Sequence, residues 1–203
     1  MGFMNNYVKV AITGGPSGGK TTLIEALKKE LGQKCAVVPE SASILYRGGF
    51  PRFKEAQAVI HAQRAIYFTQ KELEDLVCVI SQKQLIVCDR GSLDSVAYWP
   101  EDEAHFFKTM GSTKEQEFER YDWVIHLDTA APDFYDTSNP IRTETFQEAQ
   151  DLNIKIKNAW EGHPRRVIIS HNEDFISKMT TSLAVIRAIM AHKSAEQIKS
   201  ELL

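Results

Sequence analysis

The sequence predicts an α/β fold in which a parallel sheet of about five strands lies between two layers of helices. Short apolar runs of strand length alternate along the chain with longer segments whose apolar residues recur at helical spacing. Strands and helices that alternate in this way form parallel sheets covered on both faces. The 203 residues show no internal repeat, low-complexity tract or linker. We therefore expect one domain that spans residues 1–203.

The strands are expected where the apolar runs are short and bounded by turn residues, at Tyr7–Thr13, Cys35–Val38, Leu85–Cys88, Trp123–Leu127 and Arg166–Ile169. Helical spacing predicts the remaining elements, at Lys20–Leu31, Ser41–Tyr46, Lys54–Gln82, part of Ser92–Trp99, Glu115–Arg120, Glu144–Trp160 and Phe175–Lys199. Residues 128–142 contain two prolines and many polar residues, which is typical of a loop.

The composition indicates a soluble protein with an ordinary surface. Its 24 basic and 27 acidic residues give a net charge of −3, which does not favour a nucleic-acid or anionic-membrane surface. The three cysteines lack a zinc-binding spacing and are expected to be free thiols in a reducing compartment. No apolar run approaches the ~18 residues that a membrane span requires. We expect a cytoplasmic protein that binds neither nucleic acid nor membrane.

The segment Gly14–Thr21 reads GGPSGGKT and satisfies the phosphate-loop pattern G-x-x-x-x-G-K-[ST]. It follows a predicted strand and begins a predicted helix, where backbone N–H groups and the helix dipole bind phosphate. Lys20 is expected to contact the β- and γ-phosphates, and the Thr21 hydroxyl to bind Mg²⁺. A phosphate loop does not select the base, so both ATP and GTP remain open. The residues predicted to bind the nucleotide here are Gly15, Pro16, Ser17, Gly18, Gly19, Lys20, Thr21 and Thr22.

A second group of candidates follows the third predicted strand, which ends in Asp89-Arg90. Ligands of open α/β sheets bind at the carboxyl ends of the strands. Asp89 is expected to organise Mg²⁺ or to accept a proton from a substrate hydroxyl. Arg90 is expected to neutralise charge on the transferred phosphoryl group. The alternative is that Asp89 caps the next helix and that Arg90 pairs with it on the surface.

Three further residues are candidates for contact with a substrate. Glu40 follows the second predicted strand and should reach the same edge of the sheet as Asp89; the alternative is a solvated loop carboxylate. Asp94 lies in the same segment as Asp89 and Arg90. Arg64, on the long predicted helix, either faces the acceptor or belongs to a solvated helix face.

A lid is expected within residues 129–153, and it carries Arg142. A basic residue on a lid can close over the γ-phosphate and exclude water during transfer. Alternatively, Arg142 caps the helix that follows.

Several segments together resemble a known group. ITGGPSGGKTTL, VVPESA, IVCDRGSLDSVAYW, IHLD and RTETFQEAQDLNIKIKNAWEGHPRRVIIS are similar to the AAA-like P-loop NTPase group. That group is related to the nicotinamide riboside kinase domain and to the P-loop domain of a photoreceptor-channel trafficking protein. The resemblance implies a nucleotide-kinase-like, three-layer P-loop fold with sheet order 2-3-1-4-5, and it matches Arg142 to the lid arginine. It also places Asn172 and Phe175 near the nucleotide base, although Phe175 has the alternative of belonging only to the amphipathic last helix.

The resulting hypothesis is a Mg²⁺-dependent protein that transfers the γ-phosphate of ATP or GTP to a small-molecule acceptor of nucleoside or riboside type. The alternatives are an NTP-dependent regulatory switch and a slow NTPase that acts through a protein partner. The sequence lacks the guanine-selective N-K-x-D motif of Ras-type GTPases. The acceptor is not assigned, and a homodimer is kept open beside a monomer.

Overall fold

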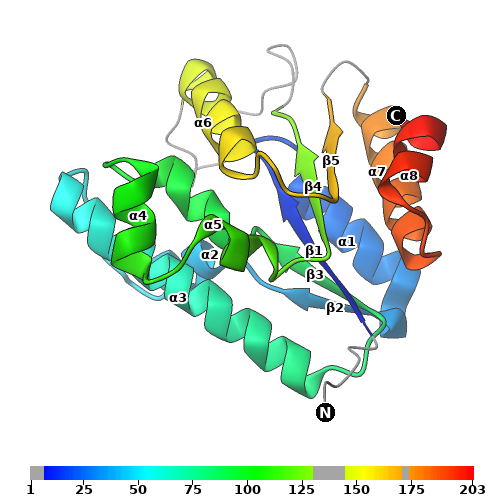
Figure 1. Ribbon diagram of the computed structural model, residues 1–203, viewed down its shortest axis with the longest axis horizontal. Helices are drawn as coiled ribbons and strands as arrows, with labels where there is room; N and C mark the ends of the chain where they lie inside the picture. Colours follow the sequence, from blue (N-terminus) through cyan, green and yellow to red (C-terminus); the bar gives the residue numbers. More distant parts are fainter. Residues whose placement is uncertain (1–6, 130–144, 171–173) are drawn as a thin grey trace.

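A computed structural model describes residues 7–129, 145–170 and 174–203, and its centre is a parallel sheet of five strands (Figure 1). The order across the sheet is β2-β3-β1-β4-β5, which confirms the order 2-3-1-4-5. The strands are β1 (Val8–Thr13), β2 (Cys35–Val38), β3 (Leu85–Asp89), β4 (Trp123–Leu127) and β5 (Arg166–Ile169).

The register of the sheet brings the ends of its three central strands to the same level. Ile12 of β1 lies opposite Asp89 of β3 on one side and opposite Ile125 of β4 on the other. On the next strand, Val38 of β2 lies opposite Cys88. The segments that leave β1, β2, β3 and β4 therefore meet at one edge of the sheet, which is the edge that binds ligands in open α/β folds.

Helices cover both faces, as the alternation of elements predicts (Figure 1). On one face, α1 (Lys20–Leu31), α7 (Phe175–Met190) and α8 (Ala195–Leu202) pack on the strands through buried aliphatic residues. The other face is more aromatic, and its core includes Tyr67, Phe106 and Trp160. The elements on that side are α3 (Ala56–Ile80), the 3₁₀ helix η2 (Ser92–Tyr98), α4 (Glu103–Met110) and α6 (Phe146–Ala159). The smaller elements are η1 (Gly32–Lys34), α2 (Ser41–Arg47) and α5 (Lys114–Phe118).

The C-terminal helix is the clearest correction to the sequence analysis. The predicted continuous helix Phe175–Lys199 is broken, because α7 ends at Met190 and α8 begins at Ala195. Between them, His192 adopts a left-handed backbone with φ of 58°. Ser194 then caps α8 through a capping box with Gln197. Ser-x-x-Gln is typical of the start of a helix, so Ser194 and Gln197 indicate a second helix within the segment that was predicted as one.

Helix α4 was not predicted at all. Asp102 caps its start by accepting a hydrogen bond of 2.7 Å from the His105 backbone N–H, and Gly111 ends it with φ of 66°. Both residues are typical helix boundaries, but only eight residues lie between them. A segment this short does not show the helical spacing of apolar residues clearly enough to predict a helix. The segment expected to be helical over part of Ser92–Trp99 is a 3₁₀ helix.

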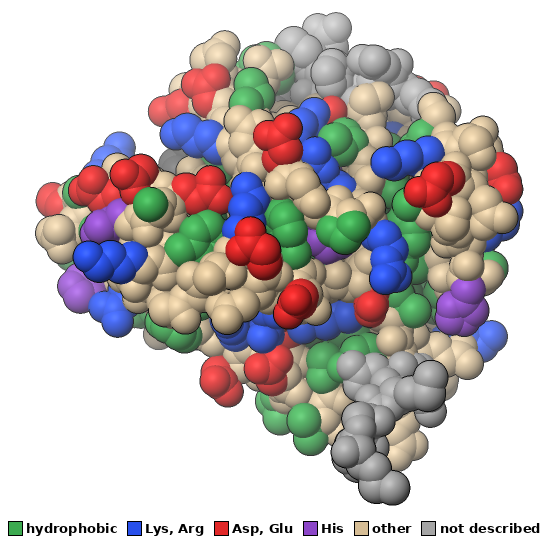
Figure 2. All heavy atoms as spheres, in the orientation of Figure 1, with side chains coloured by type: hydrophobic (Ala, Val, Ile, Leu, Met, Phe, Trp, Pro, Cys, Tyr) green, Lys and Arg blue, Asp and Glu red, His purple; other side chains and the backbone are tan. Residues whose placement is uncertain are grey.

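The surface carries both signs of charge. On the face that Figure 2 shows, Lys and Arg side chains lie interspersed with Asp and Glu. Among the described residues, none of the helices combines the length and the hydropathy needed to cross a membrane.

Candidate functional site at the phosphate loop

The loop between β1 and α1 adopts a backbone that its glycines permit. Gly14, Ser17 and Gly19 have positive φ values of 126°, 58° and 91°. A Cβ atom on Gly14 would lie 2.0 Å from the carbonyl oxygen of Leu127, so no side chain fits at that position. The loop therefore curls against the end of β4, and α1 begins directly after it at Lys20.

Lys20 is buried and folds back over its own loop. Its Nζ donates hydrogen bonds to the carbonyl oxygens of Gly14 and Gly15, at 2.9 and 2.7 Å. Burial, followed by the nearby positive charge of Arg90, lowers the pKa of Lys20 to about 7. An incoming phosphate would stabilise the charged form. Thr21, the next residue, is exposed at the first turn of α1.

Arg90 joins three segments at the sheet edge. Its Nε donates to Glu40 Oε1 at 2.5 Å, and its Nη1 lies 3.2 Å from Asp94 Oδ2 and 3.4 Å from the carbonyl oxygen of Gly14. Burial opposes the charged form, but the nearby Tyr98, Glu40 and Asp94 together raise the pKa of Arg90 well above its ordinary value, so its charge is permanent. The structure thus pairs Arg90 with Glu40 beside the phosphate loop rather than with Asp89 on the surface.

Asp94 lies beneath Arg90 and is 3% exposed. Its Oδ1 accepts hydrogen bonds from Thr13 Oγ1 at 2.5 Å and from Trp160 Nε1 at 2.8 Å, while its Oδ2 faces Arg90. Both oxygens are therefore engaged inside the protein. Asp94 orients the guanidinium of Arg90, and the substrate contact expected from the sequence stays a prediction.

Asp89 has a different environment from its neighbours. It is half-buried, and its carboxylate makes neither a hydrogen bond nor an ion pair with any residue that the structure describes. Burial and the nearby charge of Glu40 raise its pKa. The positive charges of Arg90 and Lys20 oppose this rise without removing it. A carboxylate with no hydrogen bond to the described residues is an oxygen ligand of the kind that Mg²⁺ takes. Within the described ranges, no three His, Cys, Asp or Glu side chains form a metal cluster by themselves, so the phosphates would have to complete the coordination.

On its other side the loop is fastened to α6 by a buried side chain that the sequence analysis did not identify. Asn153 Oδ1 accepts the backbone N–H of Gly15 at 2.9 Å and lies 3.0 Å from His126 Nε2. Its Nδ2 donates to Asp128 Oδ1 at 2.9 Å. A Cβ on Gly15 would lie 2.2 Å from Thr129 Oγ1 and 2.7 Å from the Asn153 Cβ. A side chain at position 15 would clash with Thr129 and with Asn153, so glycine is required there. Both neighbours are distant in sequence, so the loop sequence alone does not reveal this requirement.

Helix α7 approaches the loop from the opposite layer. Lys178 is buried and donates a hydrogen bond of 2.5 Å to the backbone oxygen of Asp128, and burial lowers its pKa to about 8. The ring of Phe175 would lie 3.3 Å from a Cβ on Gly19. The side chain of Phe175 is 48% exposed, so a ring face remains available at the loop. The structure thus brings Phe175 beside the phosphate loop, and its contact with the base stays a prediction.

The remaining predicted site residues are not joined to this cluster. Arg64 is exposed on α3, and none of the described residues forms an ion pair or hydrogen bond with its side chain. Arg142 and Asn172 lie outside the described residues, as does most of the lid expected within residues 129–153. Their roles stay predictions.

Comparisons with known proteins agree with this geometry. Residues 9–177 match the family model of an AAA domain. The fold is similar to the structure of deoxyadenosine kinase from M. mycoides with bound dATP, with a TM-score of 0.61, 13% identity, and coverage of 89% of this chain and 100% of that chain. A comparison of the sequence with curated proteins finds no significant match. The chain belongs to the AAA domain family and has the nucleotide-kinase-like P-loop NTPase fold.

Proposed function

We propose that this protein transfers the γ-phosphate of Mg·ATP or Mg·GTP to a hydroxyl group of a small-molecule acceptor of nucleoside or riboside type. The fold and the family support nucleotide binding and phosphotransfer in general. The observation that carries the finer proposal is the pairing of Glu40 with Arg90 next to Lys20.

This pairing supplies what transfer to an acceptor requires beyond nucleotide binding. Phosphoryl transfer depends mainly on positioning and on stabilising charge on the transferred group. Lys20 and Arg90 would provide two positive charges at the phosphates. Two carboxylates, Glu40 and Asp89, lie at the same edge, so one would be available to the acceptor hydroxyl and the other to the metal ion.

The two carboxylates are suited to different tasks. Burial alone would raise the pKa of Glu40, but the charge of Arg90 lowers it, so Glu40 stays ionised and can accept a hydrogen bond from a hydroxyl. Asp89, with Thr21, would hold Mg²⁺, and the cation would supply positive charge against the triphosphate. Asp94 keeps the guanidinium of Arg90 in place.

The nucleotide base would lie on the side of α7, against the exposed ring of Phe175 and near Asn172. Ring stacking of this kind accepts either purine, so the preference between ATP and GTP is decided by groups other than Phe175.

A screen for acceptor-dependent release of ADP or GDP tests the proposal. Purified protein with Mg·ATP or Mg·GTP is incubated with a panel of nucleosides, ribosides and sugars. We expect release of nucleoside diphosphate to rise by at least about tenfold over the rate without acceptor for one class of hydroxyl compound. Arg90→Ala should remove this rise but retain nucleotide binding, because Lys20 and the loop amides are left intact.

The regulatory switch is the competing function, since binding of a nucleotide by the loop alone would serve it equally well. A switch would show no acceptor-dependent release, and its protein partners in pull-down experiments would differ between the triphosphate and diphosphate states. That pair of results would contradict phosphotransfer to a small molecule.

A further inference from the structure

The turn that carries Arg90 needs support from elsewhere in the protein. Arg90 has φ of 77°, a left-handed conformation that disfavours residues with a side chain. The next residue, Gly91, packs so closely on Trp160 that a Cβ would lie 2.5 Å from the indole ring. A turn of this kind keeps its geometry only if its backbone groups are held by surrounding structure.

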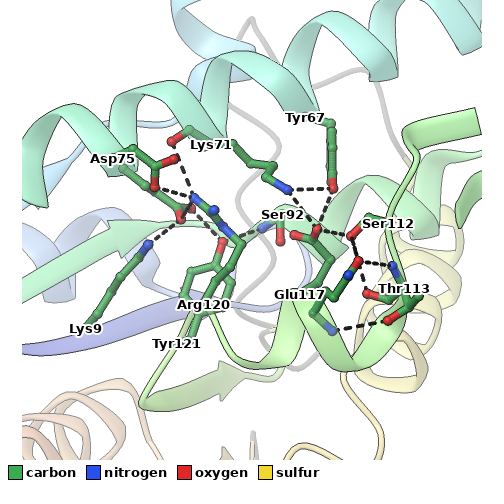
Figure 3. Close-up of polar contacts among 12 residues, drawn as sticks. Lys9, Tyr67, Lys71, Asp75, Ser92, Ser112, Thr113, Glu117, Arg120 and Tyr121 are labelled. Carbon is green, nitrogen blue, oxygen red and sulfur yellow. Dashed lines mark hydrogen bonds and ion pairs between the residues drawn. The ribbon is translucent and has the colours of Figure 1, made fainter. Parts of the chain in front are cut away.

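Two buried side chains hold the turn from either side of Gly91. The Tyr121 hydroxyl accepts the backbone N–H of Ser92 at 2.7 Å (Figure 3), and Gln70 Nε2 donates to the backbone oxygen of Arg90 at 3.4 Å. Tyr121 is 3% exposed and Gln70 is 2% exposed, so water does not compete for these bonds.

Both side chains are fixed by one buried carboxylate. Oε1 of Glu74 accepts hydrogen bonds from the Tyr121 hydroxyl at 2.6 Å and from Gln70 Nε2 at 3.2 Å. Its Oε2 pairs with Lys9 at 2.7 Å and with Arg120 at 3.0 Å, and Figure 3 shows these two cations beside Tyr121. Glu74 is completely buried, and the two cations compensate its charge. Burial and then Glu74 raise the pKa of Tyr121 well above its ordinary value, so its hydroxyl stays protonated and donates.

Gln70 also contacts the segment that carries Glu40, the ion-pair partner of Arg90. Its Oε1 accepts the backbone N–H of Ser41 at 3.3 Å, and Ser41 directly follows Glu40. The amide orientation is fixed, because a backbone N–H can only donate and the Arg90 carbonyl can only accept. One side chain of α3 therefore connects the segment that carries Glu40 with the segment that carries Arg90.

We propose that Gln70 and Tyr121, held by Glu74, are positioning residues that keep the guanidinium of Arg90 against Glu40 at the phosphate loop. The effect on turnover rests on the proposed function, whereas the effect on the geometry of Arg90 does not.

Tyr121→Phe tests this inference, and Tyr67→Phe is its matched control. Each change removes one hydroxyl from a buried tyrosine that donates to a buried glutamate, since Tyr67 bonds Glu117 Oε1 at 2.5 Å. Of the two tyrosines, Tyr121 bonds the backbone of the Arg90 turn, whereas the hydroxyl of Tyr67 bonds Glu117 and Lys71. We expect both variants to lose thermal stability, and Tyr121→Phe to lose more, because it also leaves the buried Ser92 N–H without its acceptor. Both are compared at a temperature at which they are folded, so a difference at Arg90 would not arise from unfolding.

The first measurement is the Arg90 Nε–H signal in NMR spectra of protein labelled with ¹⁵N-arginine, assigned by its loss in Arg90→Lys. We expect this signal to shift or broaden in Tyr121→Phe and to stay unchanged in Tyr67→Phe. Gln70→Leu, which leaves Tyr121 in place, should have the same effect as Tyr121→Phe, and it replaces that variant if the latter does not fold. An Arg90 signal that is unchanged in both Tyr121→Phe and Gln70→Leu overturns the inference.

The second measurement is turnover with the acceptor found in the screen. We expect kcat to fall about tenfold in Tyr121→Phe, with the KM for nucleotide within about twofold, because misplacing a charged group costs rate more than binding. Tyr67→Phe should retain the wild-type kcat. Wild-type protein without acceptor-dependent turnover would contradict the proposed function but would leave the NMR result to decide the positioning role. An altered Arg90 signal with unchanged kcat would contradict the role in turnover.

Discussion

The phosphate loop and the Arg90 turn lie side by side, yet they are held in place by different kinds of contact. In the loop, Lys20 bonds carbonyl groups five and six residues before it. In the turn, by contrast, the bonds come from Gln70 and Tyr121, which are 20 and 29 residues away from the groups they contact. The bonds of Lys20 are thus local to the loop, which α6 supports from outside through Asn153, whereas the bonds of Gln70 and Tyr121 to the turn all come from distant segments. A change in one should affect binding, and a change in the other should affect turnover.

The largest expected effect is that of Lys20→Ala on nucleotide binding. Lys20 supplies the charge at the centre of the loop, and without it the amides alone must hold the phosphates. We expect the Kd for Mg·ATP and Mg·GTP to rise by about 10³-fold, beyond detection by titration calorimetry. Lys28→Ala on the exposed side of α1 is the control and should bind normally. Wild-type affinity in Lys20→Ala would show that the loop does not bind the nucleotide.

Arg90→Ala should separate the two regions. The phosphate loop keeps its bonds to Lys20 and Asn153 and loses the 3.4 Å contact of Arg90 Nη1 with the Gly14 carbonyl oxygen. The charge that faces Glu40 is lost as well. We expect kcat for transfer to fall by about 10²-fold or more, and the Kd for nucleotide to change by less than about tenfold. Stopped-flow binding and steady-state turnover on the same preparation distinguish the two effects. A variant with normal kcat would remove Arg90 from the mechanism.

The pH dependence of binding should identify the loop as the titrating region. The pKa of free Lys20 is lowered to about 7, and bound phosphates should raise it again. The complex then holds more protons than the free protein above pH 7, so affinity falls as the pH rises. We expect a loss of up to about tenfold per pH unit between pH 7 and 9.

Calorimetry in two buffers with different heats of ionisation measures the accompanying proton uptake directly. Binding heats that are equal in both buffers at pH 8 would mean that Lys20 is already charged in the free protein.

The smallest expected effect is that of Asn153→Ala, which leaves the Gly15 N–H without its buried partner. An unpaired buried N–H costs about 1–3 kcal/mol, part of which should appear as lower stability and part as a distorted loop. We expect a lower Tm and a nucleotide Kd raised by about three- to tenfold. Asn158→Ala, on the exposed side of α6, is the control. If nucleotide affinity does not change, α6 stabilises the fold without shaping the loop.

The contrast between the two regions also explains what could be predicted from the sequence. The loop motif and the strand that ends in Asp89 are local patterns, and the structure has both at the predicted places. The bonds that connect them to the rest of the protein are not local. Nothing in the helical pattern of α3 distinguishes Gln70 from a surface glutamine, and Tyr121 simply precedes a strand.

Errors in the fold have a related cause. The spacing of apolar residues predicts a helix but does not reveal a break of a few residues. The sequence analysis therefore misses the turn at His192 between α7 and α8, although Ser194 is a typical first residue of a new helix. Asp94 shows the same limit for the site. Its position in the motif segment was evident, but its burial against Thr13 and Trp160 depends on strands and helices distant in sequence.

The bonds that Lys20 makes to its own loop should also affect the affinity of the loop for different anions. A ligand must first replace the hydrogen bonds to Gly14 and Gly15 before it can use the ammonium group. A single phosphate or sulfate ion engages fewer of these groups at once than a longer anion does. A chelated triphosphate engages the amides, the ammonium and the helix terminus together. We therefore expect the loop to bind a triphosphate more tightly than a single phosphate or sulfate ion.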